Sequence, residues 1–130
     1  MLILTIRTDK PEAEIGLFEN DKKLAYETWP AHRQLAETIH TQIDKLLMRK
    51  GRTLAQVEGI VCFAGPGSFT GLRIGVTVAN TLGYGLEIPI VAARTEKWID
   101  LGIKKLLGGE NDQIALPYYG SPVHITQPRK

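Results

Sequence analysis

The sequence predicts a single α/β domain built on a mixed β-sheet. Three short apolar, β-branched segments follow one another before residue 30, and two further apolar segments lie on either side of a helical stretch. Consecutive short strands favour antiparallel pairing, because a parallel pair requires a long crossover. Strands reached through helical crossovers run parallel. We therefore expect three antiparallel strands, then two parallel strands, with helices on the faces of the sheet.

The first three strands are predicted over residues 2–7, 13–19 and 23–29. The run Asp9-Lys10-Pro11 separates the first two, since proline and its neighbours interrupt regular structure. The pair Asn20-Asp21 suits a tight hairpin turn between the second and third strands.

A helix is predicted after the third strand, with Pro30 at its first position, where proline is tolerated. Gly51 is predicted to end this helix. Apolar residues recur at helical spacing between these limits, at Leu35, Ile39, Ile43, Leu46 and Leu47. A strongly apolar strand follows over residues 57–64. Ser68 or Thr70 is then expected to cap the next helix.

The last part of the domain is predicted to hold a strand over residues 88–92, with Pro89 near its start. A third helix is expected over residues 94–107, with apolar contacts from Trp98, Leu101 and Ile103. We expect the domain to span residues 1–108. Residues 109–130 are expected to hold a short strand at 114–116 and an extended tail from Pro117.

Composition indicates a globular protein and excludes a strongly basic one. The 130 residues are 43% hydrophobic and 23% charged, with a net charge of +2. The one cysteine, Cys62, lies in an apolar run, so it is predicted to be a buried thiol in a reducing compartment. No apolar run approaches the roughly 20 residues of a membrane span, and no basic segment precedes the first apolar stretch. We therefore expect a cytoplasmic protein that does not enter a membrane.

A glycine-rich segment, Gly-Pro-Gly-Ser-Phe-Thr-Gly-Leu-Arg-Ile-Gly-Val, occupies residues 65–76 between a strand and a helix. Gly65 and Gly67 permit a sharp turn, and the helix that follows offers free N–H groups to an anion. The spacing matches neither a P-loop nor a dinucleotide fingerprint, so a tight structural turn remains the alternative. Arg73 opposes the helix dipole and is predicted to face an acidic group or anion.

Small residues form a stripe along the same helix, at Gly71, Gly75, Ala79 and Gly83. Each helical glycine costs roughly 1 kcal/mol relative to alanine, so the stripe requires a reason. It permits close approach of the chain's own sheet or of the helix within residues 31–50. Close packing on a helix of another protein is the other interpretation, and the two are compatible.

Residues 65–76 resemble the signature of the TsaB (YeaZ) family, which belongs to a group formerly called glycoproteases. The apolar strand before the segment and Ile88-Pro89-Ile90-Val91 after the helix agree with this resemblance. It implies an actin-like half-domain with a ribonuclease-H-like sheet in the order 3-2-1-4-5. It also implies a noncatalytic scaffold or activator that binds a TsaD-like catalytic subunit, which forms threonylcarbamoyladenosine next to the anticodon of tRNA.

Further partners implied by the resemblance are a TsaE-like ATPase and a second copy of the chain, with tRNA contacted only indirectly. No cofactor or metal is expected. The partner surface is expected on two helices and the signature segment. Its predicted residues are Leu35, Ile39, Ile43, Gly65, Gly67, Ser68, Thr70, Gly71, Arg73, Gly75, Ala79 and Gly83.

Two departures from the superfamily pattern argue against nucleotide binding. The first strand commonly ends in Asp-Thr-Ser, whereas this chain has Arg7, Thr8 and Asp9, so a cation replaces the leading carboxylate. The second domain that would complete a nucleotide cleft is expected to be absent. His32 and His40 are eight residues apart and do not have metal-ligand spacing. The alternative function is a homodimeric actin-like nucleotide-binding protein or ATPase, in which two half-clefts make one site.

Overall fold

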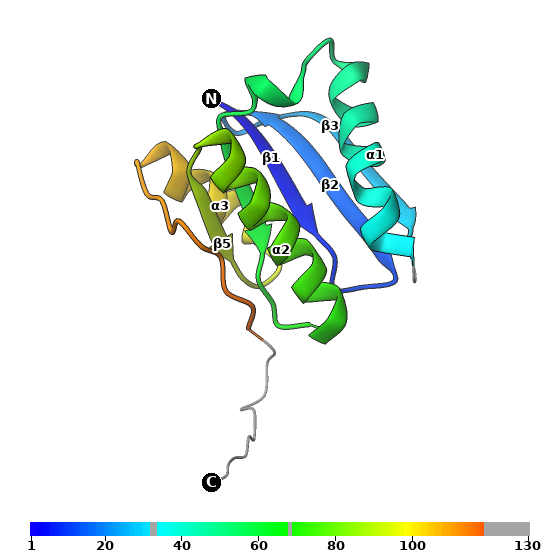
Figure 1. Ribbon diagram of the computed structural model, residues 1–130. Coiled ribbons are helices and arrows are strands. Elements are labelled where there is room, and N and C mark those ends of the chain that lie inside the picture. The colour runs from blue at the N-terminus through cyan, green and yellow to red at the C-terminus, as the bar shows by residue number, and fades with distance from the viewer. Residues whose placement is uncertain (32–33, 68, 119–130) are drawn as a thin grey trace, which may run out of the picture.

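The computed structural model describes residues 1–31, 34–67 and 69–118, and these form a five-stranded sheet with three helices (Figure 1). The strand order is β3-β2-β1-β4-β5, which confirms the predicted order. The strands are β1 (Leu2–Arg7), β2 (Glu12–Glu19), β3 (Lys22–Pro30), β4 (Gly59–Phe63) and β5 (Ile90–Ala93). The helices are α1 (Leu35–Arg49), α2 (Phe69–Leu86) and α3 (Trp98–Leu107), with a 3₁₀ turn at Leu54–Gln56.

Strand β1 lies at the centre of the sheet and is buried on both faces. It pairs antiparallel with β2 and parallel with β4, and β4 pairs parallel with β5. Leu2, Leu4 and Ile6 point to one face, where α1 and α2 cover the sheet, while Ile3 points to the face covered by α3. This alternation follows from the two-residue period of a strand.

The β2–β3 hairpin has the predicted turn, and Asn20 there adopts a left-handed φ of 53°. The prediction that Pro30 begins a helix was wrong, because Pro30 is the last residue of β3. Pro30 pairs with Glu12 on the outermost strand, where a residue without an N–H group is tolerated. Helix α1 begins five residues later, at Leu35.

Helix α1 ends at Arg49, and Gly51, whose φ is +65°, terminates it as predicted. The Gly51 N–H donates to the Met48 carbonyl, and the Arg52 N–H donates to the Leu47 carbonyl, both at 3.0 Å. These bonds form a Schellman motif, in which a left-handed residue satisfies the last carbonyls of a helix. The five apolar positions predicted for this helix are all buried.

Helix α2 begins at Phe69, so Thr70 is a residue of the helix and the prediction that it caps the helix was wrong. Ser68, the other predicted cap, lies outside the described residues. Helix α3 is shorter than predicted and begins at Trp98. Trp98 and Ile103 are buried as expected, whereas Leu101 is 47% exposed.

The strand predicted over residues 114–116 does not form in the described part of the chain. Ala115 is buried, but its backbone bonds to the side chain of Asn80 and not to a neighbouring strand. The tail from residue 119 lies outside the described residues.

No helix in the described ranges is long and apolar enough to cross a membrane. Cys62 is fully buried, and burial raises the pKa of its thiol to about 12.

Candidate functional site

The signature loop, residues 65–67, lies against the end of β1. The Gly65–Pro66 peptide is cis, and Gly65 has a φ of +123° that favours glycine. A side chain at residue 67 would collide with Cβ of Asp9. The loop therefore needs glycine at both positions. The predicted conformational reason holds for Gly65, whereas Gly67 is required by its close approach to Asp9.

The first turns of α2 are held against the same strand end by Thr8. The buried Thr8 hydroxyl donates a hydrogen bond of 2.6 Å to the Gly71 carbonyl. A Cβ atom at residue 75 would overlap the Thr8 side chain. The glycine at 75 thus lets α2 approach the end of β1 closely enough for this bond to form.

Arg7 is neutralised within the chain. Its Nε atom lies 2.7 Å from Asp9 Oδ1, and its Nη2 atom lies 3.3 Å from Asp9 Oδ2. The guanidinium also stacks 3.9 Å from the ring centroid of Phe63, which in turn makes an edge contact with Trp98. A two-point pair over an aromatic face is a strong arginine geometry. Both oxygens of Asp9 are therefore engaged, and the carboxylate is only 7% exposed.

The stripe of small residues faces the chain's own sheet. Gly75 meets Thr8, and a Cβ atom at Gly83 would come within 3.3 Å of Ile90. Ala79 is fully buried between them in the core. Of the two interpretations of the stripe, close packing within the chain is the one that these contacts show.

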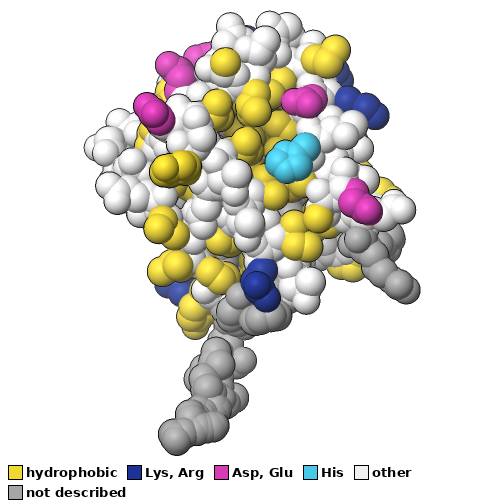
Figure 2. Space-filling view, in the orientation of Figure 1, with side chains coloured by type: hydrophobic (Ala, Val, Ile, Leu, Met, Phe, Trp, Pro, Cys, Tyr) yellow, Lys and Arg dark blue, Asp and Glu magenta, His cyan; other side chains and the backbone are white. Residues whose placement is uncertain are grey.

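A groove between α1 and α2 gathers the other part of the predicted site. It has a volume of about 360 Å³, and Figure 2 shows hydrophobic side chains along this face with a histidine beside them. Thr70 and Arg73, both predicted from sequence, lie in its α2 wall. The remaining lining residues are Ala36 and His40 of α1 and Ile74, Thr77 and Val78 of α2.

The structure thus divides the described members of the predicted set among three places, with Ala79 and Gly83 buried between α2 and the sheet. Gly65, Gly67, Gly71 and Gly75 lie around the end of β1, and Thr70 and Arg73 lie in the groove. Leu35, Ile39 and Ile43 are at most 5% exposed and pack in the core beneath α1. A protein that docks on the intact domain would therefore contact the exposed side of α1, not these three side chains.

Ala36 and His40 were not predicted as site residues. They are four residues apart on α1, so they share one face of the helix. That spacing was visible in the sequence, but only the neighbouring helix makes this face one wall of a groove.

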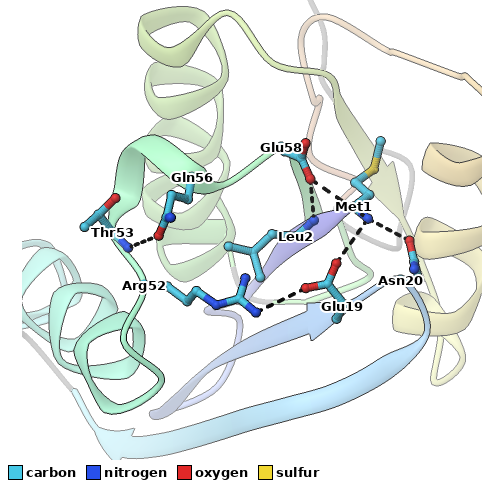
Figure 3. A network of polar contacts seen from close by, with 8 residues as sticks. All are labelled: Met1, Leu2, Glu19, Asn20, Arg52, Thr53, Gln56 and Glu58. Carbon is cyan, nitrogen blue, oxygen red and sulfur yellow. Dashed lines mark hydrogen bonds and ion pairs between the residues drawn. The ribbon is translucent and has the colours of Figure 1, made fainter.

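A second polar cluster lies at the opposite end of β1, where it connects the N-terminus with β2 and with the segment before β4 (Figure 3). The amino group of Met1 lies 2.8 Å from Asn20 Oδ1 and 3.4 Å from Glu19 Oε2. Glu58 accepts from the Leu2 N–H at 2.9 Å, and Arg52 pairs with Glu19 at 3.3 Å.

Within the described ranges, no group of three or more His, Cys, Asp or Glu side chains could hold a metal ion. His32 and His124 lie outside those ranges.

Comparison with known proteins agrees with the signature segment. The family model described as "TsaD: tRNA N6-adenosine threonylcarbamoyltransferase" matches residues 29–99, more than half of the chain. The tRNA threonylcarbamoyladenosine biosynthesis protein TsaB of Escherichia coli is 32% identical over 100 residues, covering 73% of this chain and 41% of that protein. The structure of YeaZ from Pseudomonas aeruginosa superimposes with a TM-score of 0.66 at 27% identity, over 72% of this chain and 43% of that one.

The chain belongs to the TsaB (YeaZ) family. This assignment confirms the resemblance of residues 65–76, and it agrees with the actin-like fold of the sheet. The chain is also similar to the tRNA N6-adenosine threonylcarbamoyltransferase of Geotalea uraniireducens, which is 38% identical over 95 residues, covering 73% of this chain and 28% of that protein. The chain spans less than half the length of each of these relatives.

Proposed function

We propose that this chain is a noncatalytic subunit for the synthesis of threonylcarbamoyladenosine in tRNA, and that it binds a TsaD-type catalytic subunit. Family membership and the names of the relatives support the pathway. In this proposal the chain scaffolds or activates its partner, which carries out the transfer, and contacts tRNA only through the complex.

The groove between α1 and α2 is the observation that carries the partner proposal. A groove lined by both apolar and polar side chains suits a helix of a partner, because such grooves bind amphipathic helices through their apolar face. Ile74 and Val78 supply the apolar part, while Thr70, Arg73 and Thr77 supply polar atoms. No other pair of helices in the described ranges lies on the same face of the sheet.

The state of Arg7 and Asp9 supports the noncatalytic part of the proposal. In a nucleotide site at this strand end, a carboxylate would be needed to hold a metal ion. Asp9 is instead paired with Arg7 through both oxygens, and the Arg7 guanidinium is held over Phe63. Transfer chemistry is therefore assigned to the partner.

The test is co-expression with the TsaD-type protein of the same genome, followed by size-exclusion chromatography and calorimetry. Ala36→Glu places a long charged side chain in the groove, so the affinity for the partner is expected to fall at least tenfold. Ala36 lies in the first turn of α1, where an acidic residue is favourable, so the variant should fold. Ala55→Glu, at an exposed alanine away from the groove, is the matched control and should bind normally.

Two results would contradict the proposal. Separate elution of the native chain and the TsaD-type protein at concentrations well above micromolar would refute the partnership. Equal affinities for Ala36→Glu and native chain would place the contact elsewhere on the domain.

A further inference from the structure

Residues 111–118, which we call the strap, cross the β5 side of the domain and end at the signature loop. The strap follows α3 and contains no regular secondary structure. It nevertheless forms hydrogen bonds with β5, with α2 and with Ala64 just after β4. A segment anchored at so many elements constrains them relative to one another.

At β5 the strap replaces a neighbouring strand. Asn111 Oδ1 accepts from the Ile90 N–H at 3.1 Å, and the Asp112 N–H donates to the Ile90 carbonyl at 2.8 Å. Asp112 Oδ2 accepts from the Ala92 N–H at 2.8 Å, while Lys105 Nζ donates to the Ala92 carbonyl at 3.1 Å. The outward-facing polar groups of both residues are thus satisfied, which removes the usual tendency of an edge strand to pair with another chain.

At α2 the strap is bound by one side chain, Asn80. Its Oδ1 atom accepts from the Ala115 N–H at 2.7 Å, and its Nδ2 atom donates to the Ala115 carbonyl at 3.1 Å. Asparagine is a poor helix former, so its place within α2 is accounted for by this clamp. Asn80 lies one turn beyond Thr77, which lines the groove, but Asn80 itself is outside the groove lining.

At the signature loop the strap ends in direct backbone contact. The Tyr118 N–H donates to the Ala64 carbonyl at 2.6 Å, and the Tyr118 carbonyl oxygen occupies the space that a Cβ atom at Gly65 would need. The Arg94 guanidinium also lies over the Tyr118 ring, 4.3 Å from the ring centroid. Gly65 therefore lies directly against the strap, while Gly67 lies directly against Asp9.

We propose that the strap positions the signature loop and α2, and thereby the α2 wall of the partner groove, with Asn80 as the positioning residue. This inference rests on the proposed function for one of its consequences, the effect on partner affinity. Its other consequence, coupling between the strap and the loop, belongs to the isolated chain. The two can therefore fail separately.

The test compares Asn80→Leu with the native chain. Leucine is close to asparagine in size but forms neither hydrogen bond to Ala115. Hydrogen exchange is measured by mass spectrometry for peptides covering residues 111–118, 64–77 and 35–49, at a temperature where circular dichroism shows each protein folded. Affinity for the TsaD-type subunit is measured by calorimetry. Thr81→Leu, at the exposed neighbour of Asn80 on the same helix, is the matched control.

Exchange is expected to accelerate about tenfold in residues 111–118 and in 64–77, with no change in 35–49, because two hydrogen bonds are lost. Partner affinity should fall about tenfold, and Thr81→Leu should change neither quantity. Asn80→Asp keeps the acceptor for the Ala115 N–H but lacks the donor, so an intermediate effect is expected. That variant also carries the test if Asn80→Leu does not fold.

Faster exchange confined to residues 111–118, with 64–77 and partner affinity unchanged, would overturn the inference and leave the strap as a cover for β5. If Asn80→Leu accelerates exchange in both 111–118 and 64–77 but the native chain does not bind the TsaD-type subunit, the positioning role is supported. Only the proposed function is then refuted.

Discussion

At residues 65, 67 and 75, glycine leaves room for three different neighbours. The Tyr118 carbonyl lies against Gly65, the Asp9 side chain against Gly67, and the Thr8 side chain against Gly75. Only Gly65 also has a backbone φ that favours glycine. The same residue type is therefore needed for conformation at one position and for close approach at all three.

Gly75→Ala is expected to lower the free energy of unfolding by up to about 2 kcal/mol. The new methyl group must displace Thr8, at an overpacking cost of about 1–3 kcal/mol, and the gain in helix propensity of about 1 kcal/mol offsets only part of this. Urea unfolding monitored by circular dichroism measures the change. Gly85→Ala is the matched control in α2, since nothing lies within 4 Å of its added Cβ atom, and it should be neutral or stabilising. A Gly75→Ala protein as stable as Gly85→Ala would show that α2 can move away from β1 without penalty.

At the scale of elements, α1 is defined by one buried face and one left-handed terminus. Its five buried apolar residues pack against β2 and β3, and Arg49 at its last turn pairs with Glu27 of β3 at 3.1 Å. Gly51 reverses the chain so that Arg52 can return to Glu19 of β2. The C-terminal end of α1 thus depends on backbone geometry at a single residue, whereas the groove is lined by Ala36 and His40 nearer the N-terminal end of the helix.

Gly51→Ala is expected to lower the free energy of unfolding by about 1 kcal/mol. The left-handed conformation costs a residue with a Cβ atom about 1–2 kcal/mol. Part of this cost is offset because alanine has less conformational freedom than glycine in the unfolded chain. Thermal and urea unfolding provide the measurement. Lys50→Ala, at the exposed neighbour with a φ of −110°, is the control and should have little effect. Steric overlap would not explain a loss, because nothing lies within 4 Å of the added Cβ atom. Unchanged stability would mean that the Schellman bonds contribute little.

At the scale of the whole molecule, the end of β1 differs from a nucleotide site in its charges. An internal ion pair between Arg7 and Asp9 occupies this strand end, and the Arg7 guanidinium stacks on the ring of Phe63. The described residues leave open space in several places, among them the groove between α1 and α2 and a larger hollow of about 660 Å³ beside the ends of β4 and β5. The feature that favours a protein-binding subunit over the homodimeric nucleotide-binding protein or ATPase is therefore the internal pairing of Asp9 with Arg7.

We therefore expect calorimetric titration of the isolated chain with Mg²⁺ and ATP to show no saturable heat at protein concentrations of tens of micromolar. The physical reason is that a metal ion would have to break both contacts of Asp9 with Arg7. Light scattering in the same buffer reports whether the chain is a monomer or a dimer. Tight, saturable binding, with one nucleotide shared by two chains, would favour the homodimeric alternative.

Sequence patterns predicted the fold better than the site. The continuous apolar, β-branched run in residues 2–7 follows from burial of β1 on both faces, and the helical spacing in residues 35–47 follows from burial of α1 on one face. Both patterns are local, so they identify these elements directly. The site was predicted less well because exposure depends on neighbours. Leu35, Ile39 and Ile43 have the spacing of any buried helical face, and their spacing could not tell core from interface. Asn80 has no pattern at all, since its partner is the backbone of Ala115, 35 residues away.

The sequence by itself determined the order of strands and helices, the glycine-rich turn and the family. These follow from local periodicity, from the conformational freedom of glycine and from a signature read within twelve residues. Only the tertiary structure decided which side of α2 is buried, that Asp9 neutralises Arg7, and that residues 111–118 form a strap and not a strand. Each of these depends on which distant group comes within a few ångströms, and that is set by packing of the whole domain.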